Sequence, residues 1–342
     1  MHVQARLMYA LDALYDLVRY TRHSNSLLRR AKDRYRQEAL LFYYYHKIEK
    51  ALAMSSVKQI FGLGYIGKYL ALMEQWFDEV KDLDSLAFQG GYLALEAYRR
   101  HVGVALKEVD LTLWNRINGF LSKCPTPAED GVKAGAIPIS ADRLKPKNAW
   151  KHFSALALSR SSVRNFLDKP VPTEEVTAAV HLAQRTPSVC NRQCWRVHVF
   201  STPEDKALVL KYQNGNAGFG HMAAHVLLVT ADLRTFVSSG ERNQAFIDGG
   251  LYAMSLLYAL QARGIASCPL NLGLSFFMDR ALRKAAKLPA NENLIMMIAI
   301  GYPPDELAIT ASARVPTDTM LRFRDFKTEQ VAGVNLANII IS

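Results

Sequence analysis

Two short stretches decide how this sequence is interpreted: Arg160-Ser161-Ser162-Val163-Arg164-Asn165-Phe166, and, about twenty residues on, Thr186-Pro187-Ser188-Val189-Cys190-Asn191-Arg192-Gln193-Cys194-Trp195. The first places two arginines and two serines within five residues. Arginine makes charge-assisted, bidentate hydrogen bonds to phosphate, and serine adds short ones. Alone, such a segment is more often a solvated helix entry. Together with the turn-forming second stretch, it favours a site for a phosphorylated ligand.

Helical and strand patterns alternate on both sides of these stretches. The start of this region is near Trp150, and its pattern predicts an α+β or α/β domain with a mixed sheet flanked by helices. Gly264 is a natural C-terminal cap for the longest helix, and the stretch after it leads into a loop. The expected helices are 173–184, 203–212, 242–263 and 279–287, and the expected strands are 195–201, 226–231 and 293–301.

The chain before this domain carries helical patterns and no strand pattern. Leu7, Leu11, Leu14 and Val18 form an apolar stripe that predicts a helix over 4–22. Ser24 or Asn25 can cap a second helix that runs to about Met54, and further helices are expected at 66–82, 90–103 and 106–122. The predicted organisation is a helical module (1–122), a proline-containing linker or extended arm (123–149), the α+β domain (150–327) and a C-terminal tail (328–342).

The composition is that of an ordinary globular protein with a positive charge. The 342 residues have a net charge of +11, 50% apolar residues and four cysteines. Four cysteines are too few for a disulfide framework, and their spacing does not suggest a zinc site, so we expect reduced thiols and no metal. No run of apolar residues is long enough for a membrane span, and no signal-peptide pattern is found, so a cytoplasmic location is expected. Nucleic acid is not an expected partner.

Two features of the helical module allow both a structural and a functional interpretation. Between Arg19 and Arg36, seven Lys or Arg residues stand against one acid. This is most simply a solvated helix face, and the alternative is weak contact with an anionic partner or membrane surface. His46 and Glu49 lie three residues apart, on one face of a helix, where they can form a hydrogen bond or hold a polar ligand.

The landmarks of the α+β region, in their order, resemble those of the nitroreductase family, which binds FMN. The resemblance covers about residues 150–327. It rests on the two opening stretches, with Cys194 where the family usually has proline, and on three later ones: Asp248-Gly249-Gly250, Pro269-Leu270-Asn271-Leu272-Gly273, and Ile300-Gly301-Tyr302-Pro303 followed by Arg314-Val315-Pro316. The stretch around His46 also resembles N-terminal extensions of nitroreductase-like proteins associated with polysaccharide pathways.

The resemblance implies a role for each cofactor-binding residue. Arg160, Ser162 and Arg314 would hold the FMN phosphate, and Ser161 would add a backbone contact. Arg164 would lie near the N1–C2 edge of the flavin. The backbone N–H groups of Asn271 and Leu272 would face N5 and O4, and Asn216 would contact the ribityl region. Because family members are dimers with FMN at the interface, a further set would reach the flavin of the partner subunit: Pro187, Ser188 and Asn191.

The expected activity is an FMN-dependent oxidoreductase, a homodimer that passes hydride from NAD(P)H through flavin N5 to a small-molecule acceptor. The family needs no protein nucleophile, so no catalytic side chain is named. The alternative is a non-catalytic or scaffold protein that keeps the fold within a polysaccharide biosynthesis pathway. Bound flavin distinguishes the two hypotheses.

Overall fold

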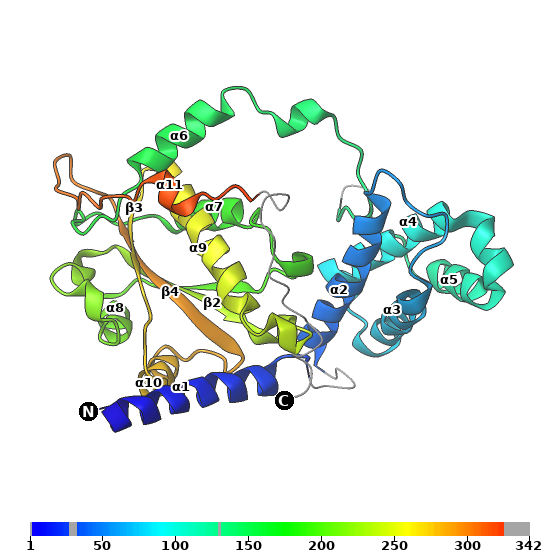
Figure 1. The fold of residues 1–342 in the computed structure, drawn as a ribbon, viewed down its shortest axis with the longest axis horizontal. Helices are drawn as coiled ribbons and strands as arrows, with labels where there is room; N and C mark the ends of the chain where they lie inside the picture. The colour runs from blue at the N-terminus through cyan, green and yellow to red at the C-terminus, as the bar shows by residue number, and fades with distance from the viewer. Residues whose placement is uncertain (1, 27–32, 129–130, 325–342) are drawn as a thin grey trace. The chain divides into compact units, whose positions relative to one another are not determined.

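The computed structural model describes residues 2–26, 33–128 and 131–324 (Figure 1). The chain forms two compact units, residues 1–307 and 308–342. Within the second unit the described residues include one short helix, α11 (Thr317–Met320). The predicted tail, 328–342, lies outside the described residues.

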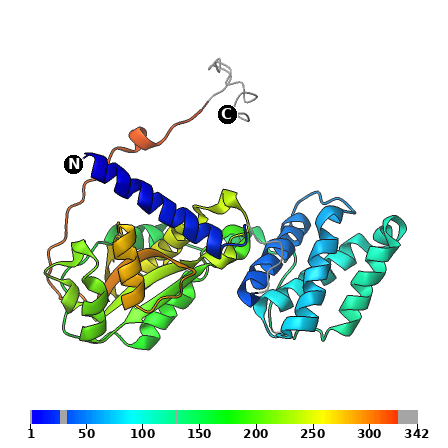
Figure 2. The same cartoon turned by 90° about the horizontal axis from the view of Figure 1, so that it is seen from below.

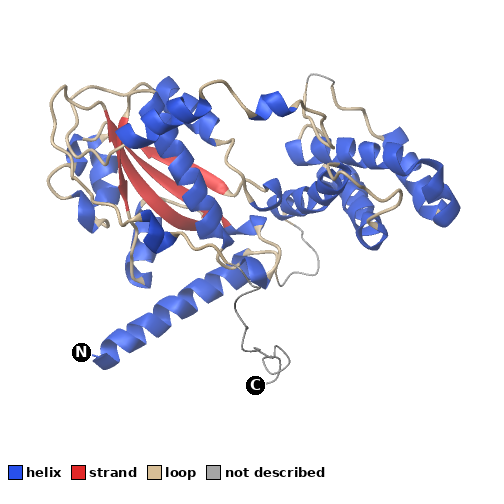
Figure 3. Cartoon of the chain, turned by 45° about the horizontal axis from the view of Figure 1, so that its top comes forward, coloured by secondary structure: helices blue, strands red, loops and turns tan. Residues whose placement is uncertain are grey.

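A four-stranded sheet organises the α+β region (Figure 3). Its order is β1-β2-β4-β3, and every pairing between these strands is antiparallel. The central strands, β2 and β4, bury nearly all of their side chains, which explains their continuous apolar sequence. The bounds are β1 (Trp195–Phe200), β2 (His225–Asp232), β3 (Ala266–Leu270) and β4 (Glu292–Gly301).

The prediction of a mixed sheet is wrong in one respect, because the sheet is antiparallel. Strands β2 and β3 do run in the same direction, as helix–strand alternation suggests, but β4 lies between them and pairs antiparallel with both. No direct parallel ladder remains between the described strands. The sequence predicted that the residues of β3 lead into a loop. They form a strand that is short and contains a proline, which explains why its strand pattern was weak.

Alternate side chains of the central strands point to opposite faces of the sheet and pack in two apolar cores. On one face, Leu227 and Val229 pack with α7 (Thr173–Ala183) and α9 (Gln244–Ala262). On the other face, Val226 and Leu228 belong to a second core that includes residues of α8 and α10. The latter helices are α8 (Pro203–Leu210) and α10 (Phe276–Ala285). Short 3-10 turns connect these elements: η3 (Val189–Asn191), η4 (Asn214–Asn216), η5 (Gly220–Met222), η6 (Leu233–Thr235) and η7 (Ser239–Glu241).

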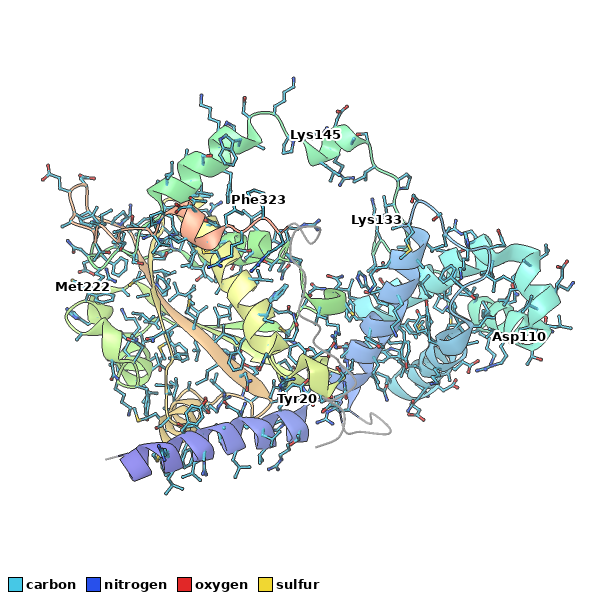
Figure 4. All side chains as sticks on the ribbon, in the orientation of Figure 1. Tyr20, Asp110, Lys133, Lys145, Met222 and Phe323 are labelled. Carbon is cyan, nitrogen blue, oxygen red and sulfur yellow. The ribbon has the colours of Figure 1, made fainter. Side chains whose placement is uncertain are left out.

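The helices after the first one form a core of their own around Tyr69, Trp76 and Tyr98. The elements are α2 (Arg34–Leu52), α3 (Leu63–Gln75), the π-turn η1 (Trp76–Val80), α4 (Leu86–Val109) and α5 (Leu111–Lys123). Side-chain caps set where α2, α4 and α5 begin: Asp110, labelled in Figure 4, accepts a hydrogen bond from the backbone N–H of Leu113 at 2.9 Å.

Helix α1 (His2–His23) packs against the sheet region (Figure 2). The Tyr15 hydroxyl donates to Asp279 of α10 at 2.6 Å, and Arg19 donates to the carbonyl oxygen of Glu292 at 2.8 Å. Near its end, Tyr20 donates to the Ser238 carbonyl oxygen at 2.6 Å. The first helix is therefore part of the structure that supports the sheet.

The predicted linker contains two short helical elements, η2 (Ala141–Leu144) and the beginning of α6 (Ala149–Ser159). Phe153 of α6 packs edge-on against Tyr258 of α9, with 5.4 Å between ring centroids. Within the arm, the N–H of Gly135 donates to Glu49 Oε1 at 3.3 Å. The arm is thus held by a contact within it and by the packing of the helix that follows it.

Candidate functional site

The arginine- and serine-rich segment runs along the outer edge of β3. The N–H of Val163 donates to the Ser267 carbonyl oxygen at 3.0 Å, and Ser162 forms an isolated parallel bridge with the same residue. The preceding α6 ends at Arg160 because the backbone there turns to an extended conformation. This pairing fixes the segment from Arg160 to Arg164 beside the edge strand.

Arg160 and Arg164 provide positive charge at this edge that no carboxylate neutralises. Neither forms an ion pair with any residue of the described chain. Arg164 donates only a long hydrogen bond, 3.4 Å, to the Ser162 carbonyl oxygen. Burial raises the pKa of the nearby Cys268 thiol, and the charges of Arg164 and Arg160 oppose that increase. The fields of both arginines therefore converge on this part of β3.

A buried hydroxyl without a partner lies in the same place. Ser267 is 1% exposed, and its Oγ has no hydrogen-bond partner among the described residues. Buried polar groups are almost always paired, so an unpaired one needs a physical reason. Two uncompensated guanidinium groups and an unpaired hydroxyl fit a phosphorylated cofactor, which supplies negative charge and acceptor oxygens.

The end of β3 leads directly to the predicted flavin-facing backbone. Gln213 Nε2 donates to the Asn271 carbonyl oxygen at 3.2 Å, which holds the residues after β3 against the turn that follows α8. Within that turn the amide nitrogen of Asn216 donates to the Leu210 carbonyl oxygen at 2.9 Å. This side-chain nitrogen is engaged locally, and the backbone carbonyl oxygen of Asn216 accepts a hydrogen bond from the Phe219 N–H at 3.2 Å. The side-chain oxygen Oδ1 of Asn216 is therefore the group that could contact a ligand.

The second predicted stretch is an unusual loop. Cys190, Asn191 and Gln193 have φ angles of 50°, 53° and 47°, a conformation that residues other than glycine rarely adopt. Ser188 Oγ accepts a hydrogen bond from the Gln193 N–H at 2.9 Å and thereby closes the loop. Positive φ angles at such residues strain the backbone. This strain persists only where the surrounding structure enforces it, and it is most frequent at ligand-binding positions.

Arg192, which the sequence analysis did not single out, anchors this loop. Its side chain is 1% exposed and forms an ion pair with Glu241. It also donates to the Thr235 carbonyl oxygen at 2.5 Å and to the Val189 carbonyl oxygen at 3.1 Å. The guanidinium lies 5.9 Å from the ring centroid of Tyr43 of α2. A single arginine among several in the sequence gave no signal of this burial.

The structure therefore groups the predicted residues only in part. Arg160, Ser161, Ser162 and Arg164 lie in one segment beside β3. The loop of Pro187, Ser188 and Asn191 is instead tied to α9, where the Val189 N–H donates to Asp248 at 3.1 Å, and to Arg192. Arg314 belongs to the second unit, where its guanidinium donates to the Ser312 carbonyl oxygen.

The other candidate pair, His46 and Glu49, forms as its spacing predicts, with 3.0 Å between Nδ1 and Oε2. Glu49 also receives the hydrogen bond from Gly135, so the pair has a structural role in holding the arm. No group of three or more metal-binding side chains occurs among the residues that the structure describes. No described helix is long and apolar enough to cross a membrane.

The α+β region is similar to known proteins. The model of the nitroreductase family matches residues 157–215 and 203–302. The chain is 30% identical over 206 residues to nitroreductase NfnB of Mycolicibacterium smegmatis, covering 47% of this chain and 86% of that protein. It is 27% identical over 226 residues to a 4-nitrobenzoate reductase of a Nocardioides species (51% and 91% covered) and 24% identical over 219 residues to human iodotyrosine deiodinase 1 (54% and 74% covered).

A solved nitroreductase family protein of Streptococcus pneumoniae superposes with a TM-score of 0.44 at 23% identity, over 50% of this chain and all of that one. The fold defines a class of α+β proteins in which helices flank an antiparallel sheet. Through its residues 157–302 the chain belongs to the nitroreductase family, which comprises NAD(P)H:FMN oxidoreductases.

Proposed function

We propose that this protein is an FMN-dependent oxidoreductase that transfers hydride from NAD(P)H to a small-molecule acceptor. The observation that carries the proposal is the edge of β3. Within the described residues, the two arginines of this edge have no carboxylate partner and the buried hydroxyl of Ser267 has no hydrogen-bond partner. When bound, FMN would supply the redox chemistry at its N5 atom.

The chain's own residues would bind and orient the cofactor. Arg160 and Ser162, with Arg314, would hold the phosphate through charge-assisted hydrogen bonds, and Ser161 would add a backbone contact. Arg164 would place a positive charge at the pyrimidine edge. The backbone N–H groups of Asn271 and Leu272 would face N5 and O4, and Asn216 would offer its side-chain oxygen Oδ1 to the ribityl chain.

A homodimer would complete the site, with Pro187, Ser188 and Asn191 reaching the flavin of the partner subunit. The strained conformation of this loop supports such a role, because it fixes Asn191 on an exposed turn. If flavin binding and dimerisation are linked, FMN should raise both the dimer fraction and the melting temperature. A fully flavin-loaded protein that remains monomeric in light scattering would contradict this part of the proposal.

Two cysteines near the proposed site are poor candidates for a nucleophile. Cys194, which stands where the family usually has proline, is 1% exposed, and burial raises the pKa of its thiol. Burial also raises the pKa of Cys268. Because the thiolate is the reactive form, these two thiols are expected to be inert at neutral pH. Catalysis would therefore rest on positioning and charge stabilisation.

Titration of the flavin-free protein with FMN tests the phosphate site. Arg160→Ala should weaken binding by about 1.5–3 kcal/mol, roughly 10- to 150-fold in Kd, because a charge-assisted hydrogen bond is lost. Arg314→Ala, measured separately, should show a loss of the same size. Arg143→Ala, an exposed arginine of η2, serves as the control and should change nothing.

Ser267→Ala gives an independent test. If the hydroxyl bonds the cofactor, the variant loses FMN affinity. If it stays unpaired in the loaded protein, removal of the hydroxyl leaves the affinity unchanged and does not destabilise the fold. Protein that is colourless as purified and does not bind added FMN would refute the proposal and favour a scaffold role.

A further inference from the structure

A large basic pocket lies between α1 and α10, which Figure 1 shows side by side. Its volume is about 910 Å³, within the range of sites that hold small organic ligands. Among the described residues that line it, none is acidic. The flavin-site proposal uses none of these residues.

Two arginines at the base of the pocket are buried and fixed. Arg19 and Arg283 are each 8% exposed, and both donate to the carbonyl oxygen of Glu292. Arg283 also pairs with Asp279, which neutralises its charge. Arg19 also donates to the neutral amide oxygen of Asn293 at 3.0 Å. It forms no direct ion pair within the described residues, and the nearby charge of Asp279 stabilises its guanidinium only in part, because the pKa of Arg19 is still lowered.

Four further cations surround these arginines and are exposed: Arg22 on α1, and Arg280, Lys284 and Lys287 on or just after α10. None of the four forms an ion pair within the part of the chain that the structure describes. Like charges gathered in a concave surface reinforce one another and raise the local concentration of anions.

Two side chains of the pocket wall hold their protons less tightly than usual, first because they are buried and then because cations lie nearby. Burial, followed by the charges of Arg19 and Arg22, lowers the pKa of His23 in the pocket wall to about 4. Burial and the charge of Arg283 likewise lower the pKa of Arg19. This mutual repulsion costs stability, and a bound anion would relieve it.

One wall of the pocket is apolar. The ring of Phe277 is 59% exposed and packs beside Phe276 with 3.8 Å between ring centroids. Val18, 51% exposed, faces the same pocket from α1. A simple inorganic ion would use the cations and leave this wall in water. A ligand with both phosphates and an organic ring would use both.

We propose that the pocket between α1 and α10 binds a small organic diphosphate of the nucleoside diphosphate class. The phosphates would bind to Arg22, Arg280 and Lys284, and the ring would pack on Phe277. The concave shape favours a free ligand over a flat lipid surface. This site is independent of the proposed flavin chemistry.

Isothermal titration of the full-length protein with ADP tests this assignment. We expect saturable binding that weakens as salt increases, because exposed charges are screened. The double variant Arg280→Ala/Lys284→Ala should bind ADP at least tenfold more weakly. Lys68→Ala/Lys107→Ala removes the same charge from exposed positions of the helical module, and its affinity should equal that of the wild type.

Two further measurements separate this pocket from other anion sites. Arg160→Ala, which alters the proposed flavin site, should leave ADP affinity unchanged. NMR titration of His23 should show that saturating ADP raises the pKa of this side chain. A Phe277→Ala variant should lose affinity for ADP but retain its affinity for inorganic pyrophosphate.

Several outcomes would overturn the proposal. They include no binding of ADP, equal ADP affinity in the Arg280→Ala/Lys284→Ala and wild-type proteins, and ADP binding that is lost in Arg160→Ala. The last measurement is flotation of the protein with phosphatidylcholine vesicles that contain a polyphosphoinositide. Binding to these vesicles without binding to ADP would assign the pocket to lipid headgroups and reject a free ligand.

Discussion

The ion pair between Arg192 and Glu241 should account for a large part of the stability of the sheet region. Its buried member, Arg192, is 1% exposed, and Glu241 is 16% exposed. Arg192→Met keeps an unbranched apolar stem, but it removes the charge, every hydrogen bond of the guanidinium and its contact with the Phe236 ring, whose centroid lies 5.8 Å from Cζ. In this variant, the carboxylate of Glu241 keeps one hydrogen-bond donor among the described residues, the Val237 N–H at 2.7 Å.

The expected loss is about 3–5 kcal/mol in the free energy of unfolding, the usual cost of removing one partner of a buried pair. The carbonyl oxygens of Thr235 and Val189 also lose their donors, which places the estimate in the upper half of that range. Flavin retention should fall as well, because Arg192 holds the loop that carries Ser188 and Asn191.

Urea unfolding of Arg192→Met, Glu241→Gln and the double variant, followed by tryptophan fluorescence, completes a double-mutant cycle. We expect a coupling energy of about 1–3 kcal/mol between the two positions. Arg116→Met, in an exposed pair with Glu74 of similar chemistry, is the matched control and should lose at most about 1 kcal/mol. A loss below about 1 kcal/mol in Arg192→Met, with coupling near zero, would refute the role of the pair.

Three further outcomes follow from other contacts. Arg164→Gln should still bind FMN but lower its midpoint potential by tens of millivolts, since about 1–3 kcal/mol of charge stabilisation is lost; equal potentials in a dye-coupled titration would place Arg164 away from the flavin ring. Burial raises the pKa of Glu292, but the hydrogen bond from His198 at 2.7 Å helps bring it below its ordinary value of 4.5. Its stabilisation is therefore present above pH 4.5 and lost as the pH falls through the lowered pKa, and Glu292→Gln should flatten that part of the stability–pH curve. Gly301→Ala should destabilise by about 1–3 kcal/mol in thermal unfolding, because the new Cβ would lie 2.9 Å from the Phe166 ring; an unchanged melting temperature would show that the ring moves freely.

The sequence predicted most elements because their patterns are local. Strands β2 and β4 are continuous apolar runs, and the apolar stripe of α1 has helical spacing. The strand order was not predictable in this way, since it depends on which edges meet after α9 crosses the sheet. Ser24 and Asn25 also differ from expectation: Asp33 caps α2, and the Asn25 side chain bonds to the Arg234 carbonyl oxygen at 2.9 Å.

The same distinction between local patterns and distant contacts decides which residues of the candidate site could be predicted. Arg160 to Arg164 could be identified because the motif is contiguous. The roles of Ser267 and Arg192 depend on burial and on partners far along the chain, and a single serine or arginine carries no pattern of either. The pocket between α1 and α10 was only partly foreseen, because the basic run from Arg19 to Arg36 did not reveal that Arg280 and Lys284 would join two of its members.

The attachment of α1 to the sheet region has a consequence for biosynthesis. Tyr15 and its partner Asp279 are 264 residues apart, so the ribosome makes the helix long before its docking surface exists. At about 5–20 residues per second, this delay is on the order of 10–60 s. During this time the helix has no partner from α10 or β4, and chaperones have access to its leucines. The contact between α1 and α10 can therefore form only after Asp279 has been made, so this helix docks long after its own synthesis.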